Sequence, residues 1–166
     1  MEKEILKVIN DYDKALTLLD CYDHQTLIKP KGNQTIYKLD YNECRMLIDM
    51  MKFESSLFGV EKDGSFKSSL NAIYQTAFGN QIYETVEEKA ANLLYFVTKN
   101  HSFVDGNKRI AASVFLLFLH KNNLLYKDGI KILSDEALVA LVILIAQSKP
   151  EEKETMVKLT LNFLVK

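Results

Sequence analysis

The sequence predicts a mostly α-helical protein that also carries one or two short β-hairpins. Through much of the chain, apolar residues recur at the three- and four-residue spacing of amphipathic helices. Residues 108–120 are apolar on nearly every side, which is typical of a helix at the centre of a bundle. No internal repeat, low-complexity tract or linker divides the 166 residues. We therefore expect one domain over residues 1–166.

Residues 1–50 are expected to form a helical extension. Six apolar residues near the start follow a helical spacing with charged residues between them: Ile5, Leu6, Ile9, Ala15, Leu16 and Leu19. This pattern predicts an amphipathic helix or a broken pair of helices. Pro30 and Gly32 then mark a turn, and residues 35–39 alternate as in a short edge strand, although a loop would fit as well.

The middle of the chain contains two helix starts with a capping residue. Asp40 can cap a helix over residues 41–53, and Thr85 can cap a helix over residues 87–100 that is too apolar for a surface position. Between them, Asp63 and Gly64 form a tight-turn signal that could join two short strands. Residues 70–83 have no clear period.

Three further helices are predicted towards the C-terminus, over residues 108–120, 134–145 and 151–164. Pro150 separates the last two and fits the first turn of a helix. The longest apolar run, residues 137–146, has about half of the roughly 20 residues that a membrane span needs. We therefore expect a buried helix there, in a soluble protein with no membrane partner.

Charge and cysteine content exclude several functions. The chain has 21 Lys and Arg against 22 Asp and Glu, and these charges are dispersed, so nucleic-acid binding by this chain alone is not expected. Cys21 and Cys44 lack the paired spacing of a metal site. With no signal peptide before them, they are expected to be reduced thiols of a cytoplasmic protein.

The chemistry concentrates in the stretch "NHSFVDGNKRIAASVF", residues 100–115. Gly106 allows a left-handed backbone and a close approach to a ligand, and Asn107 is the next-best residue for that conformation. A helix starting near Lys108 would present free N–H groups and a positive dipole end to an anion. Arg109, one of only two arginines in the chain, suits planar phosphate contacts.

The remaining polar residues of this stretch extend the phosphate-site hypothesis. A single carboxylate beside phosphates is the usual protein contribution to a Mg²⁺ site, so Asp105 is the candidate metal ligand. His101 can exchange a proton near neutral pH and could act as a general base. Phe103 is expected to anchor the loop in the core. These residues predict a site for a di- or triphosphate.

The pattern His101-x-Phe103-x-Asp105-Gly106-Asn107-Lys108-Arg109 resembles the nine-residue signature of the Fic/Doc family at every defined place. The resemblance extends over about residues 70–166, and residues 1–50 more loosely resemble the region before that core in RhuM-type virulence-associated proteins. It implies a Fic/Doc-type helical bundle with a small β-hairpin, the flap. It also implies transfer of a nucleotidyl or phosphoryl group to a hydroxyl of a protein substrate.

The resemblance assigns a role to each residue of the pattern. His101 would be the catalytic base, and Asp105 would hold Mg²⁺ on the phosphates of ATP, the co-substrate. The nucleotide-binding and phosphate-binding residues would be Gly106, Asn107, Lys108 and Arg109. The flap, which aligns the target chain by strand pairing, is placed at residues 67–77.

The resemblance leaves the transferred group open. Gly106 favours AMP transfer (AMPylation) to a Ser, Thr or Tyr hydroxyl. Lys108, and Ala112 in place of a second arginine, match the Doc branch, which implies a toxin kinase that phosphorylates its target. A third alternative is a non-catalytic nucleotide-binding module. The family's inhibitory pattern is not found, and an antitoxin or a second copy of the chain is expected as a further partner.

Overall fold

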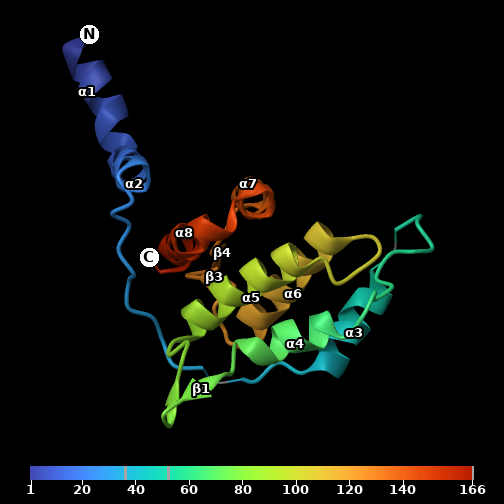
Figure 1. Cartoon of the computed structure of the whole chain (residues 1–166). Helices are drawn as coiled ribbons and strands as arrows, with labels where there is room; N and C mark the ends of the chain where they lie inside the picture. The colour runs from blue at the N-terminus through green and yellow to red at the C-terminus, as the bar shows by residue number, and fades with distance from the viewer. Residues whose placement is uncertain (36, 52, 166) are drawn as a thin grey trace.

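The computed structural model describes residues 1–35, 37–51 and 53–165, and this part of the chain is mostly α-helical, as predicted (Figure 1). The α-helices are α1 (Glu2–Asp11), α2 (Asp13–Asp23), α3 (Tyr41–Met50), α4 (Ser65–Ala72), α5 (Val86–Asn100), α6 (Asn107–Lys121), α7 (Asp135–Gln147) and α8 (Lys153–Leu164). A short 3-10 turn, η1 (Pro150–Glu152), precedes α8.

Helices α5 and α6 lie at the centre of the bundle. Helices α4, α7 and α8 pack against α5, and α3 packs against α6. Both central helices bury long apolar side chains, among which Phe115 and Phe118 of α6 are fully buried. The prediction of a central helix over residues 108–120 is therefore confirmed, with one more residue at each end.

Side-chain caps fix the starts of three helices. Asp40 accepts a hydrogen bond from the backbone N–H of Glu43 at the start of α3, and Thr85 accepts one from Glu88 at the start of α5. Ser134 caps α7 in the same way. The predicted caps Asp40 and Thr85 are confirmed, but α3 ends at Met50, so the predicted helix over residues 41–53 is too long.

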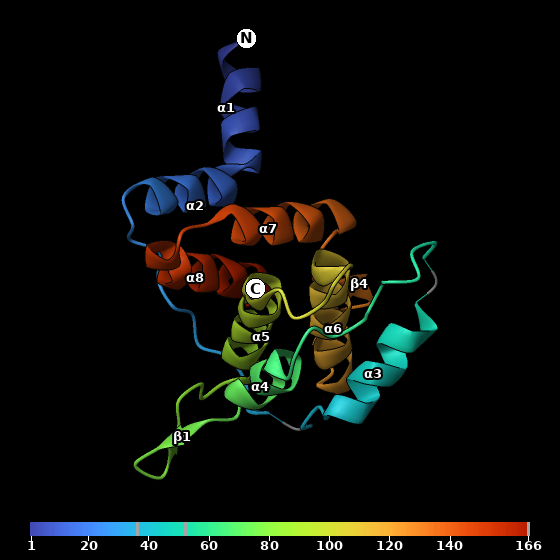
Figure 2. The ribbon, with the colours of Figure 1, turned by 45° about the vertical axis from the view of Figure 1, so that its right-hand side comes forward.

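The N-terminal extension forms the broken pair of helices. The break lies at Tyr12, between α1 and α2, and neither helix has a buried residue. In Figures 1 and 2, α1 stands away from the helical body. The segment after α2 contacts the helical body directly. The backbone N–H of Asn33 donates to both carboxylate oxygens of Glu87 in α5, at 2.9 and 2.8 Å.

Two short hairpins complete the fold. Strand β1 (Thr76–Ala77) pairs with β2 (Asn80–Gln81), and β3 (Tyr126–Lys127) pairs with β4 (Ile130–Lys131), both antiparallel. The turn between β3 and β4 is formed by Asp128 and Gly129, both with positive φ. Such an Asp-Gly pair between short strands is a hairpin signal that the sequence analysis missed.

Three local predictions differ from the structure to different degrees. Asp63 and Gly64 join no strands, because Gly64 is the N-terminal flanking residue of α4. The expected flap at residues 67–77 is placed too early, because residues 67–72 belong to α4 and only Thr76–Ala77 form strand β1 of the first hairpin. For residues 35–39 the sequence leaves both a strand and a loop open, and the described residues among them form a loop. Ile36 lies outside the described residues, as does Lys52 of the expected helix over 41–53.

Helix α7 differs from the fully buried helix that its sequence predicts. It buries Leu141, Val142 and Ile145 but exposes Val139 and Ile143. The physical reason is its position at the edge of the bundle, where only one face is covered by other helices (Figure 2). Within the described ranges, none of the helices is long and apolar enough to cross a membrane.

Candidate functional site

The motif residues form a tight loop that connects α5 to α6. His101 ends α5 in the left-handed conformation, with a φ of 47°, and Gly106 precedes α6 with a φ of 94°. The positive φ of Gly106 agrees with the sequence prediction. A left-handed histidine is uncommon, although His, Asn and Asp tolerate this region better than most side chains. The two residues together let the chain reverse between adjacent central helices.

Side chains within the loop and below it hold its shape. The side chain of Asn107 accepts a hydrogen bond from the backbone N–H of Phe103 and donates one to the Phe103 carbonyl, both at 2.9 Å. The Phe103 ring is fully buried and lies 4.9 Å, centre to centre, from the ring of Phe66. The Asn107 side chain is thus occupied by the loop. Only the backbone N–H of Asn107, at the start of α6, could contact a ligand.

An extended segment, residues 58–62, lies along the motif loop. The backbone N–H of Gly59 donates to the Asp105 carbonyl at 3.1 Å, and the N–H of Val104 donates to the Val60 carbonyl at 2.8 Å. A third bond joins the N–H of Lys62 to the Ser102 carbonyl at 2.9 Å. Sequence reasoning missed this segment because it has neither the alternation of a half-buried strand nor a turn signal at each end.

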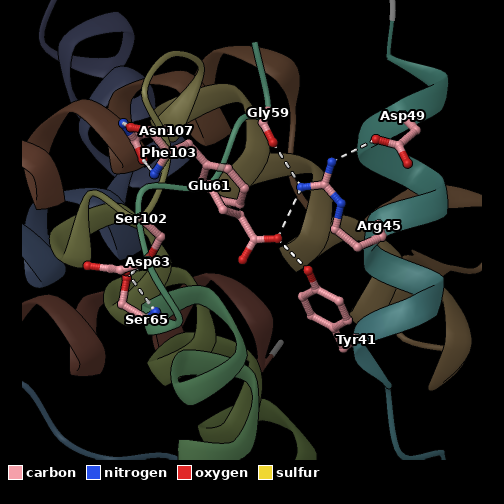
Figure 3. A network of polar contacts seen from close by, with 10 residues as sticks. All are labelled: Tyr41, Arg45, Asp49, Gly59, Glu61, Asp63, Ser65, Ser102, Phe103 and Asn107. Atoms are coloured by element: carbon pink, nitrogen blue, oxygen red, sulfur yellow. Dashed lines mark hydrogen bonds and ion pairs between the residues drawn. The ribbon is translucent and has the colours of Figure 1, made fainter. Parts of the chain in front are cut away.

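A polar network then ties this extended segment to α3 (Figure 3). The guanidinium of Arg45 donates to the Gly59 carbonyl at 2.9 Å and lies 3.4 Å from the Glu61 carboxylate. Tyr41 donates its hydroxyl hydrogen to the same carboxylate, and this bond raises the pKa of Tyr41. Asp49 pairs with the outer side of Arg45 at 2.7 Å. The network therefore holds the extended segment that supports the motif loop.

The ring of Phe58 lies directly against Gly106. A Cβ atom at Gly106 would be 2.3 Å from a carbon of that ring, closer than any real Cβ contact. The guanidinium of Arg109 lies over the rings of Phe53 and Phe58, at 4.3 and 4.8 Å from their centres. It also lies 3.4 Å from the Asp105 carboxylate. Aromatic residues ahead of the motif thus shape the loop and hold its arginine.

The start of α6 differs from those of α3, α5 and α7, although α1, α2, α4 and α8 also begin without a side-chain cap. No side chain in the described ranges caps it, whereas α3, α5 and α7 have side-chain caps. The first N–H groups of a helix have no intrahelical acceptor and carry the positive end of its dipole. Lys108, in this first turn, is exposed and forms no ion pair with any described residue. The arrangement is suited to an anion such as phosphate.

The two residues with predicted proton and metal chemistry lie at opposite ends of the loop. The His101 side chain is exposed and has no hydrogen bond to the rest of the described chain. The Asp105 carboxylate is 39% exposed beside the start of α6. One accessible carboxylate next to a phosphate site fits Mg²⁺, which usually takes one or two protein carboxylates with phosphate oxygens and water.

The other side chains that could carry chemistry lie outside the motif loop, in surroundings that do not indicate catalysis. Cys44 is fully buried in α3, and burial raises the pKa of its thiol to about 12, so it is not an activated nucleophile. His24 contacts Asp20 within the N-terminal extension, and His120 lies in the last turn of α6. The described residues contain no cluster of three or more His, Cys, Asp or Glu that could hold a metal ion.

Comparison with known proteins identifies the family. One stretch of 47 residues is 45% identical to the protein named Toxin Doc from Mycolicibacterium smegmatis, and it covers 28% of this chain and 36% of that protein. The chain thus matches little more than a third of this relative's length. No solved structure matches significantly. The model of the Fic/DOC family matches residues 24–119, which include the whole motif loop and more than half of the chain, and the chain therefore belongs to the Fic/DOC family.

Proposed function

We propose that this protein is a transferase that moves a phosphorus-containing group from a Mg²⁺-bound nucleotide to a hydroxyl of another protein. The observation that carries the proposal is the uncapped start of α6, with Lys108 and Arg109 in its first turn and His101 and Asp105 at the ends of the adjoining loop. Family membership supports the same class of reaction.

The phosphates of the nucleotide are bound at the start of α6. The free N–H groups of the first turn donate to phosphate oxygens, and Lys108 supplies an exposed positive charge. Arg109 offers a planar guanidinium, which the stack on Phe53 already orients. Asp105 would hold Mg²⁺, and the bound ion would neutralise charge on the phosphates.

His101 accepts the proton of the attacking hydroxyl. The hydroxyl oxygen forms a bond to phosphorus, the bond from phosphorus to its bridging oxygen breaks, and the proton moves to the imidazole. The exposed position of His101 leaves its ring open to a protein substrate. Attack on the α-phosphorus of ATP releases pyrophosphate and leaves AMP on the target, whereas attack on the γ-phosphorus releases ADP.

Phosphoryl transfer is the better supported of the two reactions. Gly106 matches the pattern of AMP-transferring members, but the position of the Phe58 ring gives a steric reason for glycine there whatever the reaction. Lys108 and Ala112 match the Doc branch, and the similar stretch of Toxin Doc supports the same choice. AMP transfer remains the second candidate because the full motif with Gly106 is present.

The test is a transfer assay with ATP labelled separately at the α- and γ-phosphates. The purified chain is incubated with bacterial proteins, and a His101→Asn variant is the control, since Asn also tolerates the left-handed conformation at this position. Label from the γ-position alone supports phosphoryl transfer, and label from the α-position supports AMP transfer. The His101→Asn variant should lose about 10²–10⁴-fold in rate.

The same assay can reject the proposal. If neither label is transferred by the original chain, and calorimetry shows that both proteins bind Mg-ATP equally, the chain is a nucleotide-binding module rather than a transferase. Ala112, in place of the second arginine of many members, is the feature that favours this outcome.

A further inference from the structure

Helix α1 has an apolar stripe that nothing in the described chain covers. Ile5 lies three and four residues before Val8 and Ile9, so these three side chains share one side of the helix. Tyr12, which directly follows the helix, lies four and three residues after Val8 and Ile9 and continues the same side. All four side chains are exposed, and Ile5 is 54% exposed. A helix this amphipathic is ordinarily stabilised by burying its apolar side, so we infer that α1 has a packing partner.

Helix α7 has a second uncovered apolar surface. Its residues 137–146 include no polar side chain, yet Val139 is 58% exposed and Ile143 is 43% exposed. An apolar groove of about 240 Å³ lies between α7 and the start of α6. Its lining comprises Lys108, Arg109, Ala112, Leu138, Val139, Val142 and Ile143.

The charges beside these two surfaces are complementary. Glu2 and Glu4 lie at the start of α1, and neither forms an ion pair with any residue that the structure describes. The charged residues that line the groove are both cations, and Lys108 among them has no ion pair in the described ranges. Nearby carboxylates are engaged, since Asp105 faces Arg109 and Asp135 pairs with Lys131. Glu136 at the start of α7 also interacts electrostatically with Lys131.

The same complementarity holds for the chain as a whole. Residues 1–23 contain six Asp and Glu against three Lys, a net charge of −3. Because the whole chain has a net charge of −1, the remaining residues carry +2. An anionic lipid surface would therefore repel the extension, whereas the body of another copy would attract it.

We propose that α1 of one copy of this chain seats in the α6–α7 groove of a second copy. The apolar stripe of α1 would pack on Val139 and Ile143, and Glu2 and Glu4 would face Lys108. A second copy is the occupant because α1 stands away from its own body in both views (Figures 1 and 2), while Tyr22 of α2 packs against the core and fixes the direction of the extension. Two copies that exchange α1 reciprocally form a closed dimer.

The first test is the oligomeric state of the purified chain, measured by sedimentation equilibrium over a wide range of concentrations. The original chain should dimerise, and Ile5→Asp and Val139→Asp should each shift it to monomer. Phe78→Asp is the matched control, because Phe78 is a fully exposed apolar residue at the tip of the first hairpin, away from both surfaces, and it should leave the dimer intact. Circular dichroism checks that each variant remains helical. A chain that stays monomeric throughout would overturn the proposal.

The second test distinguishes this exchange from pairing of two identical surfaces. A mixture of Ile5→Asp and Val139→Asp chains contains one intact helix and one intact groove, so it should recover a heterodimer that neither variant forms alone. Failure of the mixture to associate would contradict the exchange. Glu4→Lys should weaken the dimer more than Lys3→Glu does, and equal effects of these two reversals would also contradict it.

Discussion

The guanidinium of Arg109 is stacked on Phe53, with its central carbon 4.3 Å from the centre of the ring. Phe53 and Phe58 contact each other at 4.8 Å between ring centres, and Arg109 lies over both. The Asp105 carboxylate approaches the same guanidinium at 3.4 Å. The arginine of the motif is therefore oriented by residues about fifty positions earlier in the chain.

Phe53→Leu should weaken ATP binding by about two- to fivefold, since a cation–π contact at an exposed site is worth about 0.5–1 kcal/mol. The variant should remain as stable as the original chain within that range, because Phe53 is itself half-exposed. Calorimetry with Mg-ATP measures the effect. Phe78→Leu, which changes an exposed aromatic residue in a hairpin, is the control and should bind ATP normally. Unchanged affinity in Phe53→Leu would mean that the stack does not orient Arg109 for binding.

Gly106→Ala should lower the free energy of unfolding by about 2–5 kcal/mol. The left-handed conformation costs a non-glycine residue about 1–2 kcal/mol, and overpacking against Phe58 adds roughly 1–3 kcal/mol. Gly79→Ala separates these terms, because Gly79 has a similar φ of 81° with no neighbour near an added Cβ. In a Phe58→Ala background, the cost of Gly106→Ala should fall towards that of Gly79→Ala. Denaturant unfolding of the four variants provides the comparison, and an unchanged cost would argue against the contact.

Arg45→Met should destabilise the protein by about 1–3 kcal/mol, because it leaves the partly buried Glu61 carboxylate without its cation. The extended segment 58–62 should loosen with it. The amide of Gly59 donates to the motif loop, and the amide of Val104 donates back to the extended segment. Hydrogen exchange at both amides should become faster. Asp49→Ala removes only the exposed partner of Arg45 and should cost at most about 1 kcal/mol. Equal effects of the two substitutions would show that the contacts of Arg45 with Gly59 and Glu61 do not stabilise the protein.

Asp105→Ala should change ATP binding in opposite directions with and without Mg²⁺. With Mg²⁺ the variant loses its carboxylate ligand and should bind ATP more weakly, and excess Mg²⁺ should partly restore affinity. Without Mg²⁺ the variant lacks a negative charge that repels phosphate and competes for Arg109, so it should bind ATP at least as well as the original chain. Calorimetry in the two buffers measures both values. A similar loss in both buffers would assign Asp105 a structural role.

Glu87 should make the protein less stable as the pH rises. Its carboxyl is buried against Asn33, and burial raises its pKa above the ordinary value of 4.5 despite the hydrogen bonds from Asn33. The folded state then binds this proton more tightly than the unfolded state, so the contribution to stability is present below 4.5 and is lost as the pH rises through the raised pKa. Relative to Glu87→Gln, the original chain should lose stability as the pH rises above 4.5. Urea unfolding at several pH values measures this, and the exposed Glu84→Gln is the control, which should show no such trend.

The sequence alone determined the features that depend on residues close together in the chain. The helices follow from apolar spacing, and the starts of α3 and α5 follow from the capping residues Asp40 and Thr85. The motif residues from His101 to Arg109 are consecutive, so a single loop at a helix start is sufficient to bring them together. Local chain geometry fixes such features, which is why they could be predicted.

Only the tertiary structure decided what supports this loop and what remains uncovered. Phe58 packs on Gly106, and Arg45 holds the segment that pairs with the loop, yet neither residue belongs to a local pattern that points to the motif. The exposed face of α7 could likewise not be predicted, because its apolar sequence indicates burial on all sides. Contacts between distant segments depend on how the helices pack, and periodicity within one segment carries no information about which other segment will cover it.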